Sequence, residues 1–290
     1  MNKQNFKTQL YQLNNYENEQ SEVIYAGNPN SKEVIVFIHG ALLTYKIMTM
    51  FEPYMREYKL IFINCPSRGK SSEIERDNHT LDDYSERVYD VLSQIVTEQH
   101  LSEIKVVGYS MGGMIATRLL KFNILPISHL IYLNSAAKIT PDGSMLARLF
   151  TSDSKRDILK DEFDAVKNLP QYILDKTIFA QKENAIELFQ FVAPIKTIIT
   201  DILYTINADY LPDIEDIETF PKILFMSGKE DQIIPYTDSQ ATLEQFKIYG
   251  GTTKEIVYEG IGHLDFPSVL ETKSDQELGV VDHIKQWIQE

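Results

Sequence analysis

The chain has 290 residues, 43% hydrophobic and 24% charged, which is typical of a soluble globular protein with a sizeable core. The formal net charge of −14 makes nucleic acid and anionic membrane surfaces poor partners. One cysteine (Cys65), a polar amino-terminal segment without a signal sequence and the lack of a long apolar stretch lead us to expect no disulfide, no membrane insertion and a cytoplasmic location.

Short apolar, β-branched segments recur along the chain, each followed by a turn. Segments that are apolar on both faces are typical of buried strands in a parallel sheet. Near the amino terminus, TQLYQL and SEVIYAG predict one or two additional edge strands that run antiparallel to their neighbours. The sequence predicts central strands over residues 33–40, 59–66, 103–110, 129–136, 222–231 and 254–263.

Helical patterns lie between several of these strands. Residues 80–99 begin with Thr80 as a candidate N-cap and Asp83 three positions later, and their apolar residues fall on one helix face. A second helix is predicted directly after Ser110, in MGGMIATRLLKF, and a third near the end, in QELGVVDHIKQWIQ. This alternation predicts an α/β fold with a mostly parallel central sheet flanked by helices on both faces.

Residues 137–219 break the alternation. They contain helix-like patterns but no convincing strand, and they are too long for a simple crossover. We therefore predict a helical cap insertion over 137–219, on the carboxyl edge of a core formed by 1–136 and 220–290. Its aromatic residues either line an apolar pocket or simply form the interior of the cap; they are Phe150, Phe163, Tyr172, Phe179, Phe189, Phe191 and Tyr204.

The segment GYSMG, residues 108–112, fits the pattern G-x-S-x-G, with a predicted strand before it and a helix after it. Glycines at 108 and 112 suit a tight turn that lifts Ser110 above the sheet. The following helix then starts beneath the serine, with free N–H groups and the positive end of its dipole. The backbone N–H of Met111 points to where an oxyanion would form, so the pattern predicts a nucleophilic serine.

A nucleophilic serine needs a base and an acid that orients it. His263 follows the last predicted strand, in EGIGHLDFP, and is our candidate base. Asp231 follows the penultimate strand, and we predict that it orients the imidazole, with the neighbouring Glu230 as the alternative. Polar or helical surroundings favour surface or capping roles for His79, His100, His129 and His283.

The order Ser110, Asp231, His263 resembles that of the α/β-hydrolase superfamily, in its serine hydrolase branch with a helical cap. Four motifs carry the resemblance between about Val34 and Trp287: FIHGALL, CPSRGKS with HTLDDYSERV behind it, GYSMGGMIA, and GKEDQIIP paired with GIGH. It implies that the backbone N–H of Ala41 is the second oxyanion donor.

By the same resemblance, His39 is a structural residue beneath the oxyanion loop rather than a base. Relatives often carry Asp-x-Pro-Gly-x-Gly-x-Ser after the second central strand, where this chain has Asn64 and Ser67 at the acidic and first glycine positions. We expect this difference to affect the local loop geometry alone.

The same loop, NCPSRGKS, differs by one residue from the phosphate-binding pattern G-x-x-x-x-G-K-[ST]. Asn64 replaces the first glycine, and no helix is predicted to begin at Lys70, where a phosphate cradle needs one. Metal-binding patterns such as H-E-x-x-H or paired cysteines are missing. We therefore predict no nucleotide, cofactor or metal.

These features predict a carboxylesterase that acts on small or medium apolar esters through an acyl-enzyme. Leu42 and Leu43, beside the oxyanion loop, and Tyr109 in the elbow are predicted to contact this small-molecule substrate. Aspartate, not serine, occupies the elbow in relatives with dehalogenase or epoxide hydrolase chemistry.

Two alternative functions remain open. One is the same triad acting on a lysophospholipid, an amide or peptide, a thioester or a carbon–carbon bond, and the other is a non-catalytic ligand-binding protein. The sequence does not indicate which oligomeric state the protein adopts.

Overall fold

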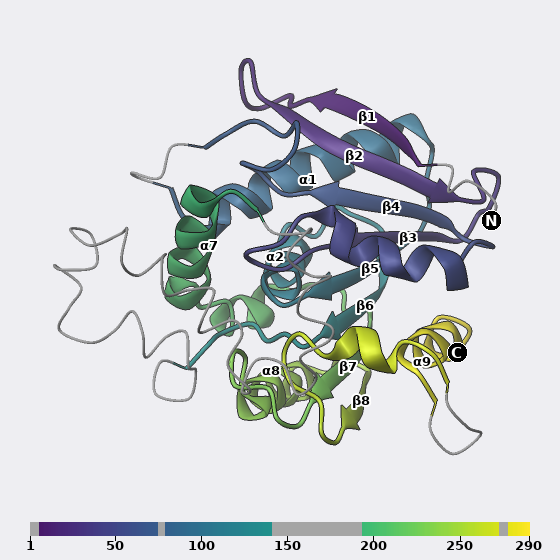
Figure 1. The fold of residues 1–290 in the computed structure, drawn as a ribbon, viewed down its shortest axis with the longest axis vertical. Coiled ribbons are helices and arrows are strands. Elements are labelled where there is room, and N and C mark those ends of the chain that lie inside the picture. Colours follow the sequence, from purple (N-terminus) through teal and green to yellow (C-terminus); the bar gives the residue numbers. More distant parts are fainter. Residues whose placement is uncertain (1–5, 75–78, 141–192, 273–277) are drawn as a thin grey trace, which may run out of the picture.

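The computed structural model describes residues 6–74, 79–140, 193–272 and 278–290. Its eight strands form one sheet in the order β1-β2-β4-β3-β5-β6-β7-β8 (Figure 1). The strands are β1 (Lys7–Gln12), β2 (Gln20–Gly27), β3 (Val34–Ile38), β4 (Lys59–Asn64), β5 (Ile104–Tyr109), β6 (Ile127–Leu133), β7 (Lys222–Gly228) and β8 (Thr253–Tyr258).

The sheet confirms the predicted topology. Strands β3 to β8 all run parallel to one another, as the six central segments predicted. The two amino-terminal strands pair antiparallel with each other, and β2 pairs antiparallel with β4. The carboxyl ends of β3 to β8 therefore meet at one edge, where the loops that follow them lie close together.

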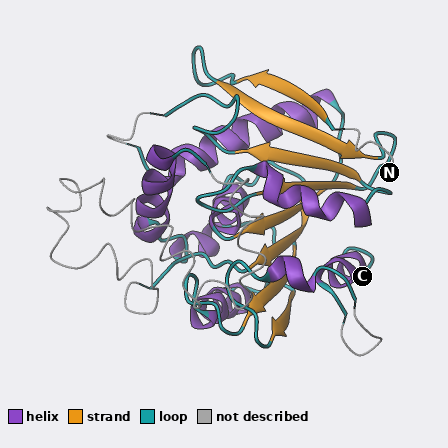
Figure 2. Ribbon diagram, in the orientation of Figure 1, coloured by secondary structure: helices purple, strands orange, loops and turns teal. Residues whose placement is uncertain are grey.

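Helices cover both faces of the sheet (Figure 2). In the view of Figure 1, α1, α2 and α8 lie behind the sheet, and the 3₁₀ segment η1 and helix α9 lie in front of it. The three predicted helices are confirmed as α1 (Leu81–Glu98), α2 (Met111–Lys121) and α9 (Val280–Trp287), whereas η1 (Tyr45–Tyr54) and α8 (Tyr236–Ile248) were not predicted.

Helix α1 begins as its sequence predicts. The Thr80 side chain accepts a hydrogen bond from the helix amides, and Asp83 accepts one from the Thr80 amide, which forms a capping box. Such a cap satisfies two amides that lack partners within the helix, and losing it typically costs about 1 kcal/mol. The buried face of α1 then packs against α2 and β2.

Most of the predicted cap, residues 141–192, lies outside the described residues, and with it the six aromatic positions from Phe150 to Phe191. The described remainder holds α7 (Ile195–Asn207) and the short η3 (Pro212–Asp216). In Figure 1, α7 stands beside the carboxyl edge of the sheet, and its Tyr204 packs edge-on against Tyr84 of α1. The division into core and cap stays a prediction.

The sheet interior forms the hydrophobic core. Every residue of β3 and β5 is buried, as two-sided packing requires. Within the described ranges, no helix combines the length and the hydrophobicity needed to cross a membrane.

Candidate active site

Ser110 lies at the junction of β5 and α2, where the chain turns sharply. Its φ of 53° and ψ of −123° lie in a region that non-glycine residues rarely adopt. Two hydrogen bonds hold this strained backbone: the Ser110 amide donates to Leu133 O at 3.0 Å, and the Ser135 hydroxyl donates to Ser110 O at 2.6 Å. The turn places the serine side chain directly before the first turn of α2, as the G-x-S-x-G pattern predicts.

Close backbone approach explains the glycines on either side of Ser110. A Cβ at Gly108 would lie 2.5 Å from the Cα of Gly113. A Cβ at Gly112 would overlap the carbonyl oxygen of Ile38, at the end of β3. The glycines therefore let the start of α2 pack directly on β3 and β5, beneath the serine.

We expect Gly112→Ala to destabilise the protein by about 1–3 kcal/mol, because an added methyl group in a packed site forces backbone shifts. The overlap is with a backbone atom, which cannot rotate away as a side chain can. Urea denaturation followed by circular dichroism measures the change. The control is Gly260→Asn, since Gly260 has open space around it and its φ of 71° is close to the left-handed region that asparagine adopts. An unchanged unfolding midpoint for Gly112→Ala would contradict the packing argument.

The structure brings Ser110, His263 and Asp231 together from three different strand ends. Nε2 of His263 lies 2.9 Å from Oγ of Ser110, and Nδ1 lies 2.7 Å from Oδ2 of Asp231. An ionised carboxylate only accepts hydrogen bonds, so Nδ1 carries the ring proton and Nε2 is left to accept from the serine hydroxyl. All three residues are buried. This is the geometry of a nucleophile, a base and an orienting acid.

Asp231 and Glu230 differ in exposure and in their hydrogen-bond partners. Oδ1 of Asp231 accepts hydrogen bonds from the amides of Ile233 and Ile234, both at 2.9 Å, which fixes the carboxylate toward the imidazole. Glu230 is exposed, and its Oε2 accepts from the Ile261 amide at 3.0 Å. The geometry therefore favours Asp231 over the alternative acid.

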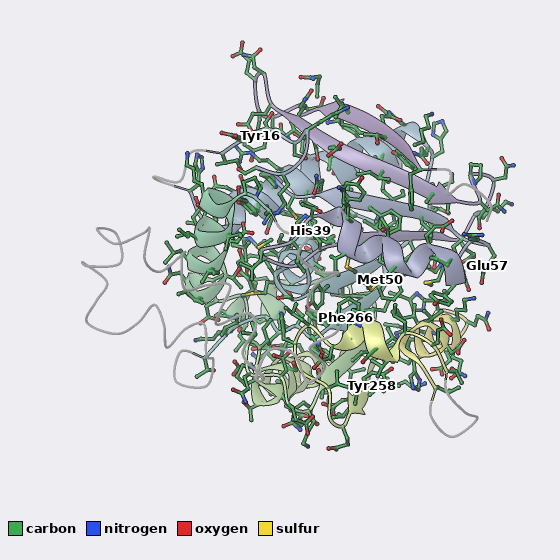
Figure 3. The ribbon with its side chains drawn as sticks, viewed as in Figure 1. Tyr16, His39, Met50, Glu57, Tyr258 and Phe266 are labelled. Carbon is green, nitrogen blue, oxygen red and sulfur yellow. The ribbon has the colours of Figure 1, made fainter. Side chains whose placement is uncertain are left out.

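His39 is buried under the loop that follows β3 (Figure 3). Its Nδ1 lies 2.8 Å from Gly40 O, and the Cys65 amide donates to its Nε2 at 3.1 Å. Burial, assisted by the Arg68 guanidinium, lowers the pKa of His39 well below its ordinary value, so the ring is neutral. Nδ1–H thus fixes the Gly40–Ala41 peptide, which agrees with the structural part expected for this histidine.

Two backbone amides are the candidate oxyanion donors. Ala41 follows Gly40, whose Cα packs so close to the elbow that a Cβ there would lie 2.9 Å from the Cβ of Ser110. Met111 is the first residue of α2. Within the described part of the chain, neither amide donates to a protein acceptor. They are therefore free to bind an oxygen beside Ser110.

The predicted substrate contacts lie in different settings. Leu42 is half-buried and packs against an apolar cluster formed by Ala193, Ile198 and Ile202, whereas Leu43 is buried in the main core. Tyr109 has no exposed surface; its hydroxyl donates to His263 O at 2.9 Å and its ring stacks on the imidazole. Contact of these three residues with a substrate stays a prediction.

Asn134, at the end of β6, is a residue that the sequence reasoning missed. Its Nδ2 donates to His263 O at 2.9 Å, and its Oδ1 accepts from the Gly228 amide at 2.8 Å. It thereby ties the loop that carries His263 to the end of β7, just before Asp231. The signal in the sequence was a polar residue directly after a buried strand, at the same edge as the serine.

The loop after β4 carries Asn64 and Ser67, the two positions at which the sequence departs from the pattern common in relatives. Ser67 has a φ of 63°, which is in the left-handed region that favours glycine. The Asn64 side chain accepts from the Tyr45 amide at 3.2 Å and donates to the Glu22 carboxylate at 2.9 Å, which anchors the loop although position 64 is not acidic. Lys70 is exposed and lies in a turn, and no helix begins at it, as the sequence predicted.

The remaining histidines lie on other elements. His79 lies 2.8 Å from Asp83 at the start of α1, as the expected capping role suggests. His129 is buried in β6, so the prediction of a surface or capping position was wrong for it: its ring packs edge-on against Trp287. In the ranges that the structure describes, no cluster of three or more His, Cys, Asp or Glu is arranged to hold a metal ion.

Comparison with known proteins supports the fold. A family model described as the alpha/beta hydrolase family matches residues 35–275, which is most of the chain. The chain is similar to an esterase from Exiguobacterium antarcticum, with 18% identity over 98% of this chain and 100% of that one, at a TM-score of 0.71.

Two further solved structures are similar over nearly their full lengths. The esterase RhEst1 from a Rhodococcus species shows 13% identity over 97% of this chain and 98% of that one, at a TM-score of 0.72. A bromoperoxidase from Bacillus anthracis shows 16% identity over 98% and 100%, also at 0.72. At these identities the likeness concerns the fold alone.

Proposed function

The chain belongs to the α/β-hydrolase family, and from this premise we propose that it is a serine carboxylesterase with Ser110 as nucleophile, His263 as base and Asp231 as orienting acid. The observation that carries the proposal is the continuous hydrogen-bonded chain from Ser110 Oγ through the His263 ring to Asp231. Such a chain lets a proton leave the hydroxyl as the oxygen attacks a carbonyl.

In the first half of the reaction, Ser110 Oγ adds to the ester carbonyl carbon while Nε2 of His263 accepts the hydroxyl proton. The carbonyl oxygen becomes an oxyanion, which the amides of Ala41 and Met111 bind. Each such donor is worth about 3–4 kcal/mol of barrier by comparison with measured deletions. His263 then donates its proton to the leaving alcohol, and the acyl group remains bonded to Ser110.

In the second half, water takes the place of the alcohol. His263 accepts a proton from the water as its oxygen adds to the acyl carbon, and the same two amides bind the second oxyanion. The bond to Ser110 Oγ then breaks, and the serine recovers its proton from His263. Throughout, Asp231 keeps the imidazole in the tautomer that accepts from a hydroxyl and stabilises its protonated form.

An apolar acyl group of small or medium size is the proposed substrate. Leu42 follows the proposed oxyanion donor directly and packs against Ala193, Ile198 and Ile202. These side chains place apolar surface beside the reacting centre, where an alkyl chain gains free energy by leaving water. A charged acyl group would lose its hydration there with no partner among these residues.

The experiment that tests the substrate class is a panel of p-nitrophenyl esters from acetate to laurate, with a matched thioester, anilide and lysophosphatidylcholine. We expect the highest kcat/KM for the short and medium esters, whose alkyl chains can pack against Leu42 and the apolar residues described beside it. A preference for the anilide, thioester or phospholipid would assign the same residues to another bond. If the native protein turned over none of these compounds, the ligand-binding alternative would be favoured instead.

A further inference from the structure

A second buried charged group lies close to the proposed site. Arg68, in the loop after β4, forms an ion pair with Asp201 of α7, and neither side chain has any exposed surface. The free-energy cost of removing two charges from water can exceed the gain from their attraction. The remaining polar atoms of the pair therefore need hydrogen-bond partners. Oδ1 of Asp201 accepts from the Tyr84 hydroxyl at 3.1 Å, and Oδ2 accepts from the Leu42 amide at 3.0 Å as well as from Arg68.

The guanidinium of Arg68 also contacts backbone carbonyls, one in the loop after β3 and one in its own loop after β4. Its Nε donates to Leu43 O at 2.8 Å, and its Nη1 donates to Pro66 O at 2.6 Å. Burial by itself would lower the pKa of Arg68, but the Asp201 carboxylate raises it above the usual value, so the guanidinium stays charged. The pair thus holds the backbone of residues 42 and 43 between two opposite charges.

Leu42 is the residue on which these contacts converge. Its amide donates to Asp201, its carbonyl accepts from the Ala193 amide at 2.7 Å, and its φ of 69° is in the left-handed region. A leucine does not adopt that conformation without support from its surroundings. The segment that leads into α7, together with α7 itself, provides the support.

The consequence for Ala41 follows from peptide geometry. The Gly40–Ala41 peptide is fixed through its carbonyl by His39, at 2.8 Å. The Ala41–Leu42 peptide is fixed through its N–H by Asp201, at 3.0 Å. Because a peptide unit is planar, the contact at Gly40 O sets the direction of the Ala41 N–H, which lies in the same unit opposite that carbonyl. The contact with Asp201 anchors the next unit and so restrains rotation of the first unit about the N–Cα bond of Ala41.

We propose that Asp201, neutralised by Arg68, is a positioning residue: it holds the Leu42 amide so that the Ala41 N–H points at the oxyanion. This inference rests on the proposed function. The arrangement explains the ion pair, because a lone carboxylate near a developing oxyanion would repel it, whereas a carboxylate paired with Arg68 positions the loop without adding net charge. It also makes α7, a helix of the predicted cap, part of the support for transition-state binding.

The first test compares Asp201→Ala with the native protein in p-nitrophenyl acetate turnover. We expect kcat to fall by about 100-fold, the loss typical of a misplaced catalytic group, with KM changed by less than about threefold. The affinity for phenylboronic acid, which forms a tetrahedral adduct on the serine, should fall in parallel with kcat. A contact that serves folding alone would not shift kcat and boronate affinity together in the folded fraction.

A double variant separates positioning from charge pairing. In Arg68→Met/Asp201→Leu, no buried charge is left unpaired, and such replacements are often neutral for stability. We expect this variant to fold, by circular dichroism, and still to show the lowered kcat, because nothing accepts from the Leu42 amide. If its kcat returned to the native value, the ion pair would serve stability and the proposal would be overturned.

Asp238→Ala is the matched control. Asp238 is also a buried helix carboxylate that accepts a loop amide, that of Thr140 at 2.9 Å. Native kcat in this control and a loss in Asp201→Ala would support the proposal; equal losses in both would overturn it. A fluorophosphonate that labels Ser110 of the native protein establishes the proposed function by itself, so unchanged kcat in Asp201→Ala alongside native labelling would refute the positioning role alone.

Discussion

Replacing Ser110 by alanine is expected to lower ester turnover by about 10⁶-fold, the loss seen when a triad serine is removed from a comparable enzyme. The variant keeps the elbow backbone, because the Leu133 and Ser135 contacts involve only main-chain atoms of residue 110. What disappears is the oxygen that lies 2.9 Å from His263 Nε2. Steady-state hydrolysis of p-nitrophenyl acetate measures the loss, and mass spectrometry after fluorophosphonate treatment locates the adduct.

Ser85→Ala provides the matched control for this substitution. Ser85 is also buried, but its hydroxyl donates to Leu81 O within α1, at 3.0 Å. We expect native labelling and turnover from this variant, and neither from Ser110→Ala. Labelling that survives the change at 110 would mean that a different side chain is the nucleophile.

The second large effect is expected for Asp231→Asn, where kcat should fall by about 10⁴-fold. Because the amides of Ile233 and Ile234 hold Oδ1, the asparagine would keep its oxygen toward them and present its NH₂ group to His263. The imidazole would then have to accept at Nδ1 and carry its proton on Nε2, where it cannot take a proton from Ser110. Initial rates across pH 6–9 measure the loss.

Glu230→Gln tests whether the neighbouring carboxylate takes part in turnover. Its oxygen can still accept from the Ile261 amide after the change, so we expect the native rate. If Glu230→Gln rather than Asp231→Asn removed turnover, the acid would have to reach the imidazole by a rearrangement of the loop after β7. Near-native rates in both variants would argue against any carboxylate in the reaction.

Most of the sheet could be predicted from the sequence, because its central strands are apolar on both faces and each ends in a turn. Helix α8 was missed because its buried face is not uniformly apolar. Several residues on its buried side are polar, among them Asp238, Ser239 and Thr242, so it lacks the apolar stripe that marks a surface helix. The 3₁₀ segment η1 was missed because Pro53 lies within it, which argues against a helix.

The candidate triad could be predicted because its members each follow a strand of a parallel sheet, and strand order determines where they meet. The residues that support it could not. Asp201 lies far along the chain from Leu42, and Asn134 lies far from His263. No pattern of spacing in the sequence indicates that either pair forms a hydrogen bond. Contacts of this kind arise from packing, which a single sequence does not display.

The left-handed backbone at Ser110, with a φ of 53°, sets folding and reactivity against each other. Glycine would adopt that conformation with less strain, so the serine is retained against the preference of the local backbone. A library sorted only for heat resistance would therefore tend to discard the very side chain on which activity depends. Directed evolution of this scaffold has to sort each generation for turnover and thermal tolerance together.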